Sequence, residues 1–201
     1  MSKNFRRPPE EWSPHEIEVD AKMKVVRNDK ENFYIASIPW KHNPPELRNN
    51  LSMVRARQER TNSDEALKVK GTSKEAIDAI FQAQLEKGYI REVTDPKDIH
   101  RDDCNYIPYF PVVRPDRAST KVRVVFDAAA KNRDKQSLNS QIEKGPNCLQ
   151  DLFGILLRFR QFAIALTADI SEMFLQCRLD PNDSRYHRFW WDERFWEWVR
   201  I

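Results

Sequence analysis

The sequence of 201 residues predicts an α+β fold, and three observations carry this prediction. Residues 72–88 repeat apolar side chains at helical spacing behind a capping motif. Several shorter runs are rich in β-branched and aromatic side chains, as strands are. Only 4 glycines stand against 12 prolines, and neither glycine-rich nucleotide-binding pattern occurs, which argues against a doubly wound fold.

Composition and charge narrow the class of protein. No run approaches the roughly 20 apolar residues that span a bilayer, which argues against a membrane protein. Three widely spaced cysteines and the lack of a secretory segment predict a reducing, intracellular compartment, either cytoplasmic or nuclear. The net charge of +3 comes from 34 basic and 31 acidic residues, so only local clustering can indicate a polyanionic partner.

The first 100 residues divide into two predicted regions. Residues 1–31 mix charges with prolines and few apolar side chains, which predicts a flexible linker. Residues 32–100 form a second region with two predicted helices, opened by an aromatic strand at or near a sheet edge. The first helix follows Pro44 and Pro45 and runs to about Arg60.

The second helix is the best defined in the chain. A capping box at residues 72–75 begins it, and Gly88 occupies the position of a left-handed C-cap. Its apolar stripe consists of Ile77, Ile80, Phe81 and Leu85. Two further strands are predicted at residues 89–93 and 107–113.

The second half of the chain alternates strand and helix signals. Residues 121–127 predict a strand with basic side chains on one face and apolar ones on the other. Residues 162–167 predict a strand buried on both faces, and residues 186–201 predict a hairpin that the chain leaves unfinished at its C-terminus. Asn147 and Gln150 are predicted to cap a helix whose inward side chains are Leu149, Leu152, Phe153, Leu156 and Leu157.

Asp169 stands where the buried strand is predicted to end. A carboxylate held rigidly at a strand end suits a hard cation such as Mg²⁺, which binds few protein carboxylates together with substrate phosphates. The alternative is that Asp169 only caps a helix that begins near Ser171. The local pattern leaves both interpretations open.

Three segments in order resemble a reverse transcriptase, namely residues 119–127, 137–139 and 167–176. Finer matches resemble the Pao/BEL class of long-terminal-repeat retrotransposons, and the resemblance covers about residues 32–201. It implies a partial right-hand polymerase fold, with fingers and the first part of the palm in residues 101–201. The segments that carry the finer resemblance are 38–41, 88–90, 107–115, 145–147, 151–153 and 156–160.

The resemblance also implies roles for single residues. Asp169 matches the first catalytic aspartate, which binds both metal ions (Mg²⁺ or Mn²⁺), and the carbonyl of Ile170 matches a second metal contact. Phe174 matches the bulky residue beneath the sugar of an incoming dNTP, although a core aromatic is an equal alternative. Lys121 and Arg123 match residues that contact the triphosphate.

A basic cluster supports a phosphate-facing surface. Residues 114–135 hold 7 basic and 3 acidic side chains, a local balance of +4. The nearby residues predicted to bind an RNA or DNA template–primer are Arg114, Arg117, Lys131 and Arg133. The alternative is a merely solvated charged face.

The sequence departs from the family in one respect that limits its activity. No Tyr-x-Asp-Asp motif occurs, and the pair Asp102–Asp103 lies upstream of Asp169 instead of after it. We therefore expect a fragment of an RNA-directed DNA polymerase that is inactive alone, with two-metal nucleotidyl transfer in the full-length protein. The alternatives are a non-catalytic nucleic-acid-binding remnant of a retroelement and a structural protein in which Asp169 caps a helix.

Overall fold

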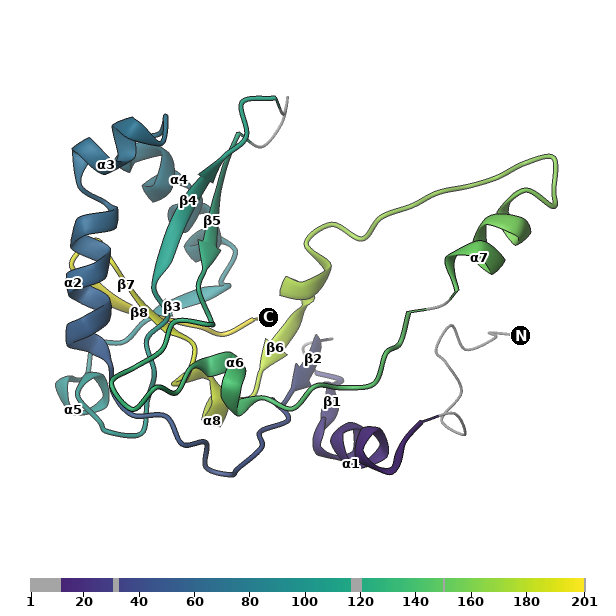
Figure 1. Ribbon diagram of the computed structural model, residues 1–201, viewed down its shortest axis with the longest axis horizontal. Coiled ribbons are helices and arrows are strands. Elements are labelled where there is room, and N and C mark those ends of the chain that lie inside the picture. Colours follow the sequence, from purple (N-terminus) through teal and green to yellow (C-terminus); the bar gives the residue numbers. More distant parts are fainter. Residues whose placement is uncertain (1–11, 31–32, 117–120, 150, 201) are drawn as a thin grey trace.

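Two three-stranded sheets and a two-stranded hairpin frame the computed structural model, which describes residues 12–30, 33–116, 121–149 and 151–200. Figure 1 shows most of the helices and strands gathered into one body, from which residues 151–171, including one helix, extend as an arm. The structure confirms that helices and strands are mixed, as the α+β prediction requires. No helix among the described residues combines the length and apolar character needed to cross a membrane.

The first sheet joins the two ends of the chain. Its order is β1-β2-β6, with β1 and β2 antiparallel and β2 and β6 parallel. The strand predicted at or near a sheet edge is thus β2, the central strand of this three-stranded sheet. The helix α1 precedes this sheet and starts in a capping box formed by Ser13 and Glu16, so the predicted linker is wrong for residues 12–30. The bounds are α1 Pro14–Lys22, β1 Val25–Asn28, β2 Phe33–Ala36 and β6 Cys177–Leu179.

Four helices occupy residues 32–100, where the sequence predicted two. α3 is only six residues long, too short for a periodic signal, and Ser63 caps it. α2 begins later than predicted because Asn49 is tied to another loop: its side-chain amide donates to the carbonyls of Ile99 and Arg101 at 3.1 and 3.0 Å. The bounds are α2 Leu51–Thr61, α3 Asp64–Val69, α4 Lys74–Glu86 and α5 Pro96–Ile99.

The structure confirms the predicted helix at α4. Its N-cap is Ser73, whose hydroxyl accepts a hydrogen bond from the backbone N–H of Ala76 at 3.4 Å. The capping box predicted at residues 72–75 is not formed, because the hydroxyl of Thr72 has no hydrogen-bond partner within the described residues. At the other end Gly88 has a φ of +66°, the left-handed conformation that glycine adopts without a steric penalty. The helix therefore begins and ends on local signals that the sequence carries.

The main core lies between α4, the β4–β5 hairpin and the second sheet, whose order is β3-β8-β7. Phe81 of α4 is fully buried, and its ring lies 4.9–6.2 Å from four aromatic rings that the strands supply: Tyr109, Phe126, Phe189 and Trp191. Offset and edge-on aromatic contacts of this kind add to the energy of apolar burial. The bounds are β3 Ile90–Glu92, β4 Tyr109–Val113, β5 Val122–Phe126, β7 Arg188–Trp191 and β8 Arg194–Trp198.

The predicted C-terminal hairpin is confirmed as β7 and β8. Asp192 and Glu193 form its two-residue turn with φ values of 51° and 58°, which match the twist of the flanking strands. The hairpin carries a buried ion pair between Arg188 and Glu197 at 3.2 Å, and Arg188 also contacts Asp98 of α5 at 2.6 Å. Burial opposes the charge of Asp98, but the hydrogen bond from Arg188 leaves its pKa below the ordinary value.

A smaller core places the N-terminal segment against the C-terminal one. Asp183 accepts hydrogen bonds from the indole N–H of Trp40 at 2.7 Å and from the backbone N–H of Ile38 at 2.8 Å. His187 is buried beside them, 3.1 Å through Nδ1 from the carbonyl oxygen of Asp183, which requires a proton on that nitrogen. Burial lowers the pKa of His187. Two short helices border this core, α6 (Leu138–Gln141) and α8 (Pro181–Ser184).

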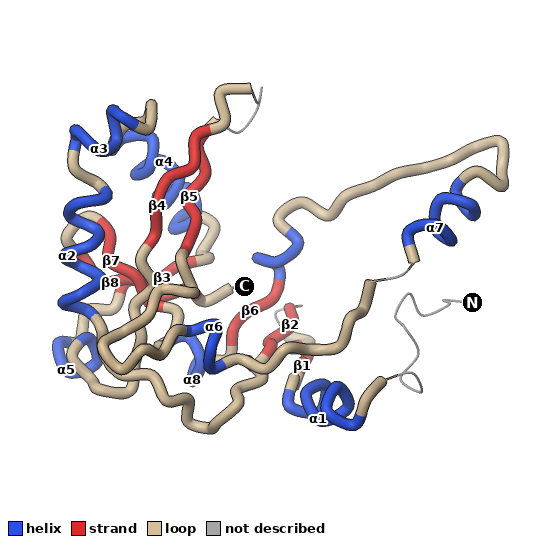
Figure 2. The backbone as a smooth tube through the Cα atoms, in the orientation of Figure 1, coloured by secondary structure: helices blue, strands red, loops and turns tan. Residues whose placement is uncertain are grey.

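The arm differs most from the sequence prediction. α7 (Leu152–Phe159) is capped by Asp151, not by Asn147 with Gln150, and Gln150 itself lies outside the described residues. Residues 162–167 form no strand, because no neighbouring strand is present in the described chain to pair with them. Figure 2 shows the arm standing away from the body. The side chains predicted to point inward are all exposed: Leu149, Leu152, Phe153, Leu156 and Leu157.

We predict that Phe81→Ala lowers the free energy of unfolding by about 3–5 kcal/mol, because it leaves a cavity among four aromatic rings. Urea denaturation followed by tryptophan fluorescence measures this. The matched control is Phe153→Ala, since Phe153 is 69% exposed on α7 and its loss should change stability by less than about 0.5 kcal/mol. Equal effects of the two substitutions would contradict the placement of the core.

His187 should make stability depend on pH. Burial holds the pKa of His187 below its ordinary value of 6.5, so the unfolded chain binds the proton more readily than the folded one. The stability that the neutral imidazole contributes is complete above pH 6.5 and is lost as the pH falls below it. Between pH 7.5 and 5.5, about 1.4 kcal/mol of stability is lost through this group if it stays neutral when folded. Urea denaturation should show a smaller loss in His187→Gln. The exposed His100→Gln should behave as the wild type, and a wild-type slope in His187→Gln would contradict the prediction.

Candidate nucleic-acid interface

The β4–β5 hairpin presents basic side chains on one face and packs the other face into the core. Lys121 and Arg123 are exposed and lie two residues apart, so they point to the same side of the strand. Val124 and Phe126 alternate with them and pack against the aromatic core. The two-faced strand predicted from residues 121–127 is thus confirmed in its burial pattern.

Arg114 joins these cations at the tip of the hairpin. Its backbone N–H donates to the carbonyl oxygen of Lys121 at 2.7 Å, which extends the strand pairing by one step. Within the described residues, the side chains of Arg114, Lys121 and Arg123 form no salt bridge. Three positive charges without a carboxylate partner, held on a rigid hairpin, are suited to bind phosphate groups.

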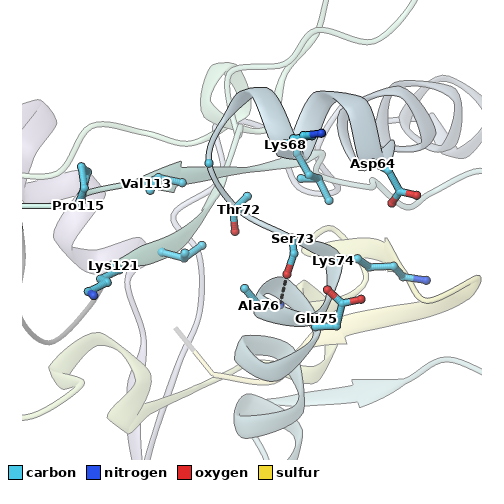
Figure 3. A pocket seen from close by; sticks show the side chains of 13 residues that line it. Asp64, Lys68, Thr72, Ser73, Lys74, Glu75, Ala76, Val113, Pro115 and Lys121 are labelled. Carbon is cyan, nitrogen blue, oxygen red and sulfur yellow. Dashed lines mark hydrogen bonds between the residues drawn. The ribbon is translucent and has the colours of Figure 1, made fainter.

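A cavity of about 750 Å³ lies between the hairpin and the corner where α3 meets α4. Figure 3 shows Lys121 on one side of it and Lys68 and Lys74 on the other. Two carboxylates also line it, those of Asp64 and Glu75, so its side chains carry one net positive charge. Hydrogen bonding to Ser73 lowers the pKa of Glu75, which keeps this carboxylate ionised.

The N-terminal end of α4 also lines the cavity. The backbone N–H groups at this end give a helix a partial positive charge. Beside it, the hydroxyl oxygen of Thr72 is buried and has no hydrogen-bond partner within the described residues. The sequence predicts the basic strand, but it does not predict this cavity. Its walls come from segments about 50 residues apart, and no local pattern signals that they meet.

Two other predicted nucleic-acid contacts, Lys131 and Arg133, do not belong to this surface. Lys131 and Arg133 are exposed in the loop that follows β5, beyond the end of the strand that is remote from the hairpin tip. Arg133 lines a separate cavity of about 230 Å³ together with Arg48 and Asp102. Arg117 lies outside the described residues. The structure therefore gathers Arg114 with Lys121 and Arg123 and places Lys131 and Arg133 elsewhere.

Asp169 is exposed in the extended part of the arm, and the residues that precede it do not form the predicted strand. The segment after it forms the 3₁₀ helix η2 (Met173–Gln176), whose cap residue is Glu172 and whose N-terminus receives no side-chain hydrogen bond. The alternative in which Asp169 caps a helix is therefore not seen either. Ile170 and Phe174 are 64% and 78% exposed, and the cavity beside Lys121 contains none of these three residues.

The surroundings of Asp169 do not fit a two-metal site. Such a site needs several oxygen ligands that converge on the cations. Among the residues that the structure describes, no three His, Cys, Asp or Glu side chains converge in this way. The nearest acidic residue along the chain, Glu172, is engaged with Lys87 and Tyr89. We therefore derive no chemical step through a metal at this position.

Glu172 is a residue whose role the sequence did not reveal. Its carboxylate accepts hydrogen bonds from Lys87 Nζ at 2.6 Å and from the hydroxyl of Tyr89 at 2.7 Å. The hydrogen bond from Lys87 lowers the pKa of Glu172, and the same contact raises the pKa of Lys87. The partners are 83 and 85 residues away in the sequence, so no motif or spacing could have joined them.

Comparisons with known proteins give structural matches only. No protein-family model matches the chain, and no curated protein matches it. The native protease–reverse transcriptase of prototype foamy virus is 20% identical with a TM-score of 0.47, over 64% of this chain and 15% of that one. The foamy viral enzyme solved with an RNA/DNA hybrid is 19% identical with a TM-score of 0.44, over 64% and 15%. This chain spans less than a quarter of the length of these structures.

The exposed arm should be the first part of the described chain that a protease cuts. We expect trypsin to cut first after Arg158 or Arg160, because residues 160–170 are exposed and lie outside any sheet. Mass spectrometry of early digestion products measures the sites. Replacing both arginines by glutamine should remove the first products and leave the later ones. Initial cleavage after the buried Arg188 would contradict this placement of the arm.

Proposed function

We propose that this chain is the fingers and the beginning of the palm of a reverse transcriptase of the Pao/BEL retrotransposon type. The observation that carries the proposal is the basic face of the β4–β5 hairpin. Its cations match the reverse-transcriptase motif in the sequence, and its opposite face is fixed in the core. In this role the hairpin binds phosphates of a template–primer and of an incoming dNTP.

The packing supports a fixed position for the hairpin cations. Phe126 of β5 lies 6.2 Å from Phe81 and 5.2 Å from Phe189, ring centre to ring centre. Lys121 and Arg123 are therefore mounted on a strand that cannot shift without disturbing the core. Arginine can bind two phosphate oxygens at once when its backbone is held in this way. Phosphate binding at the hairpin would then lose little side-chain and backbone entropy.

The division of the chain follows the same proposal. We assign residues 32–100 to a region that precedes and supports the fingers through α4, and residues 101–201 to the fingers and palm. Asp169 and the carbonyl of Ile170 are proposed metal contacts, and Phe174 the residue beneath the sugar. Mg²⁺ or Mn²⁺ would need further carboxylates from a Tyr-x-Asp-Asp motif, which this sequence lacks. Nucleotidyl transfer is thus assigned to a longer polymerase and not to this chain alone.

A non-catalytic nucleic-acid-binding remnant is the second candidate function. The observation that favours it is the isolation of Asp169, which has no convergent acidic or histidine partners within the described residues. Both candidates bind nucleic acid through the hairpin. They differ in the dNTP, which only the polymerase fragment is expected to bind at Lys121 and Arg123.

We predict that Lys121→Ala with Arg123→Ala weakens binding to an RNA/DNA template–primer and flattens its salt dependence. Each lost phosphate contact should reduce the slope of log affinity against log salt by about 0.9, so the pair should reduce it by about 1.8. Fluorescence anisotropy at several salt concentrations measures both quantities.

The control removes the same charge from another part of the surface. Lys24→Ala with Lys97→Ala replaces two exposed lysines, one beside β1 and one on α5, and should leave the slope close to that of the wild type. Equal slopes in the wild type and the hairpin variant would refute the hairpin as the phosphate-binding surface. Competition by a dNTP in the same assay would favour the polymerase fragment over the remnant.

A further inference from the structure

Two hydrogen-bond donors, the ammonium of Lys87 and the hydroxyl of Tyr89, lie at the end of α4. Lys87 is the C-cap residue of the helix, and its backbone N–H still donates to the carbonyl oxygen of Ala83 at 3.2 Å. Gly88 then turns the chain in the left-handed conformation. Tyr89 follows with only 6% exposure, and its ring lies 5.1 Å from the guanidinium of Arg200. The hydroxyl of Tyr89 is thus held by a buried ring, whereas the side chain of Lys87 is about half-exposed.

Glu172 brings the chain of the arm to these donors. Its carboxylate lies 2.6 Å from Lys87 Nζ and 2.7 Å from the Tyr89 hydroxyl, and we name this arrangement the Glu172 clasp. The backbone of Glu172 has a φ of 51° and a ψ of 39°, a left-handed conformation that residues with a Cβ rarely adopt. Its carbonyl oxygen accepts from the N–H of Leu175 at 2.8 Å, so the clasp sits where the arm turns into η2.

Apolar packing does not explain why the arm turns at this point. Ile170, Met173 and Phe174 are 64%, 49% and 78% exposed, so they bury little surface against the body. The backbone on the arm side, residues 162–171, belongs to no sheet in the described chain. On the far side of the turn, η2 leads directly into β6, which is paired with β2. Among the hydrogen bonds and ion pairs of the described residues, those of Glu172 join this segment to the end of α4.

We propose that Glu172 is a positioning residue, whose clasp on Lys87 and Tyr89 sets the location of residues 169–174 against the end of α4. The significance for Asp169 and Phe174 rests on the proposed function, since that function gives these residues their roles. The clasp itself is a property of this chain and is measured without any activity. The clasp links α4, which packs against the basic hairpin, to the segment that carries Asp169, the proposed catalytic aspartate.

The test measures a distance between the arm and α4. Spin labels are placed at Ile170→Cys and Ala83→Cys, both exposed positions, in a chain where Cys148 and Cys177 are replaced by serine. Cys104 remains, because it is buried and burial raises the pKa of its thiol to about 11. Double electron–electron resonance should give one narrow distance distribution. Glu172→Gln and Lys87→Met should each broaden it at least twofold.

Two further variants separate the clasp from a general loss of structure. Glu193→Gln is the matched control, because Glu193 is also an exposed glutamate with positive φ, at the β7–β8 turn, and it should leave the distribution narrow. Glu172→Lys combined with Lys87→Glu reverses the pair and should restore most of the narrow distribution. Far-UV circular dichroism confirms that each variant is folded.

The outcomes distinguish this inference from the proposed function. An unchanged distribution in folded Glu172→Gln, or no recovery in the reversed pair, would overturn the clasp while leaving the hairpin result intact. A hairpin variant that binds nucleic acid as the wild type does would refute the proposed function without altering the measured distance. Broadening in Glu172→Gln together with recovery in the reversed pair supports the clasp.

Discussion

The aromatic cluster around Phe81 is the constraint on which the remaining architecture depends. One side chain of α4 contacts rings from β4, β5 and β7, so helix, hairpin and sheet share a single packing centre. Interiors packed to this density do not allow one element to slide past another without creating a void. The position of the basic hairpin face is therefore a consequence of how the core is filled. The packing of Phe126 in this core is sufficient to hold the β4–β5 hairpin in position.

Local chemistry decides which parts of the fold the sequence can predict. Ser73 and Gly88 mark the two ends of α4, and the alternation from Lys121 to Phe126 separates the exposed face of β5 from its buried face. The turn at Asp192 and Glu193 likewise follows from short-range pairing. Each of these signals lies within a few residues of the element it specifies, and α4, β5 and the β7–β8 hairpin were predicted correctly for that reason.

Contacts between residues far apart in the sequence determine the parts of the fold that the sequence did not predict. The apolar pattern of residues 162–167 is suited to a buried strand, but a strand forms only beside a partner, and in the described chain these residues have none. The isolation of Asp169 follows from the same lack of pairing. Glu172 shows the opposite case, since an ordinary acidic residue gains two partners from a distant helix end. For the candidate site, the sequence therefore predicted the basic face but neither the surroundings of Asp169 nor the clasp.

The parallel pairing of β2 with β6 has a consequence for the order of events during synthesis. Tyr34 lies opposite Cys177 in this pair, so the contact closes a loop of more than 140 residues. Contacts of such separation form late, because loop-closure entropy is lost before pairing compensates for it. On the ribosome, the edge of β2 that pairs with β6 stays unpaired until residues 177–179 have emerged. A protecting chaperone or a transient local partner would have its greatest effect during that interval.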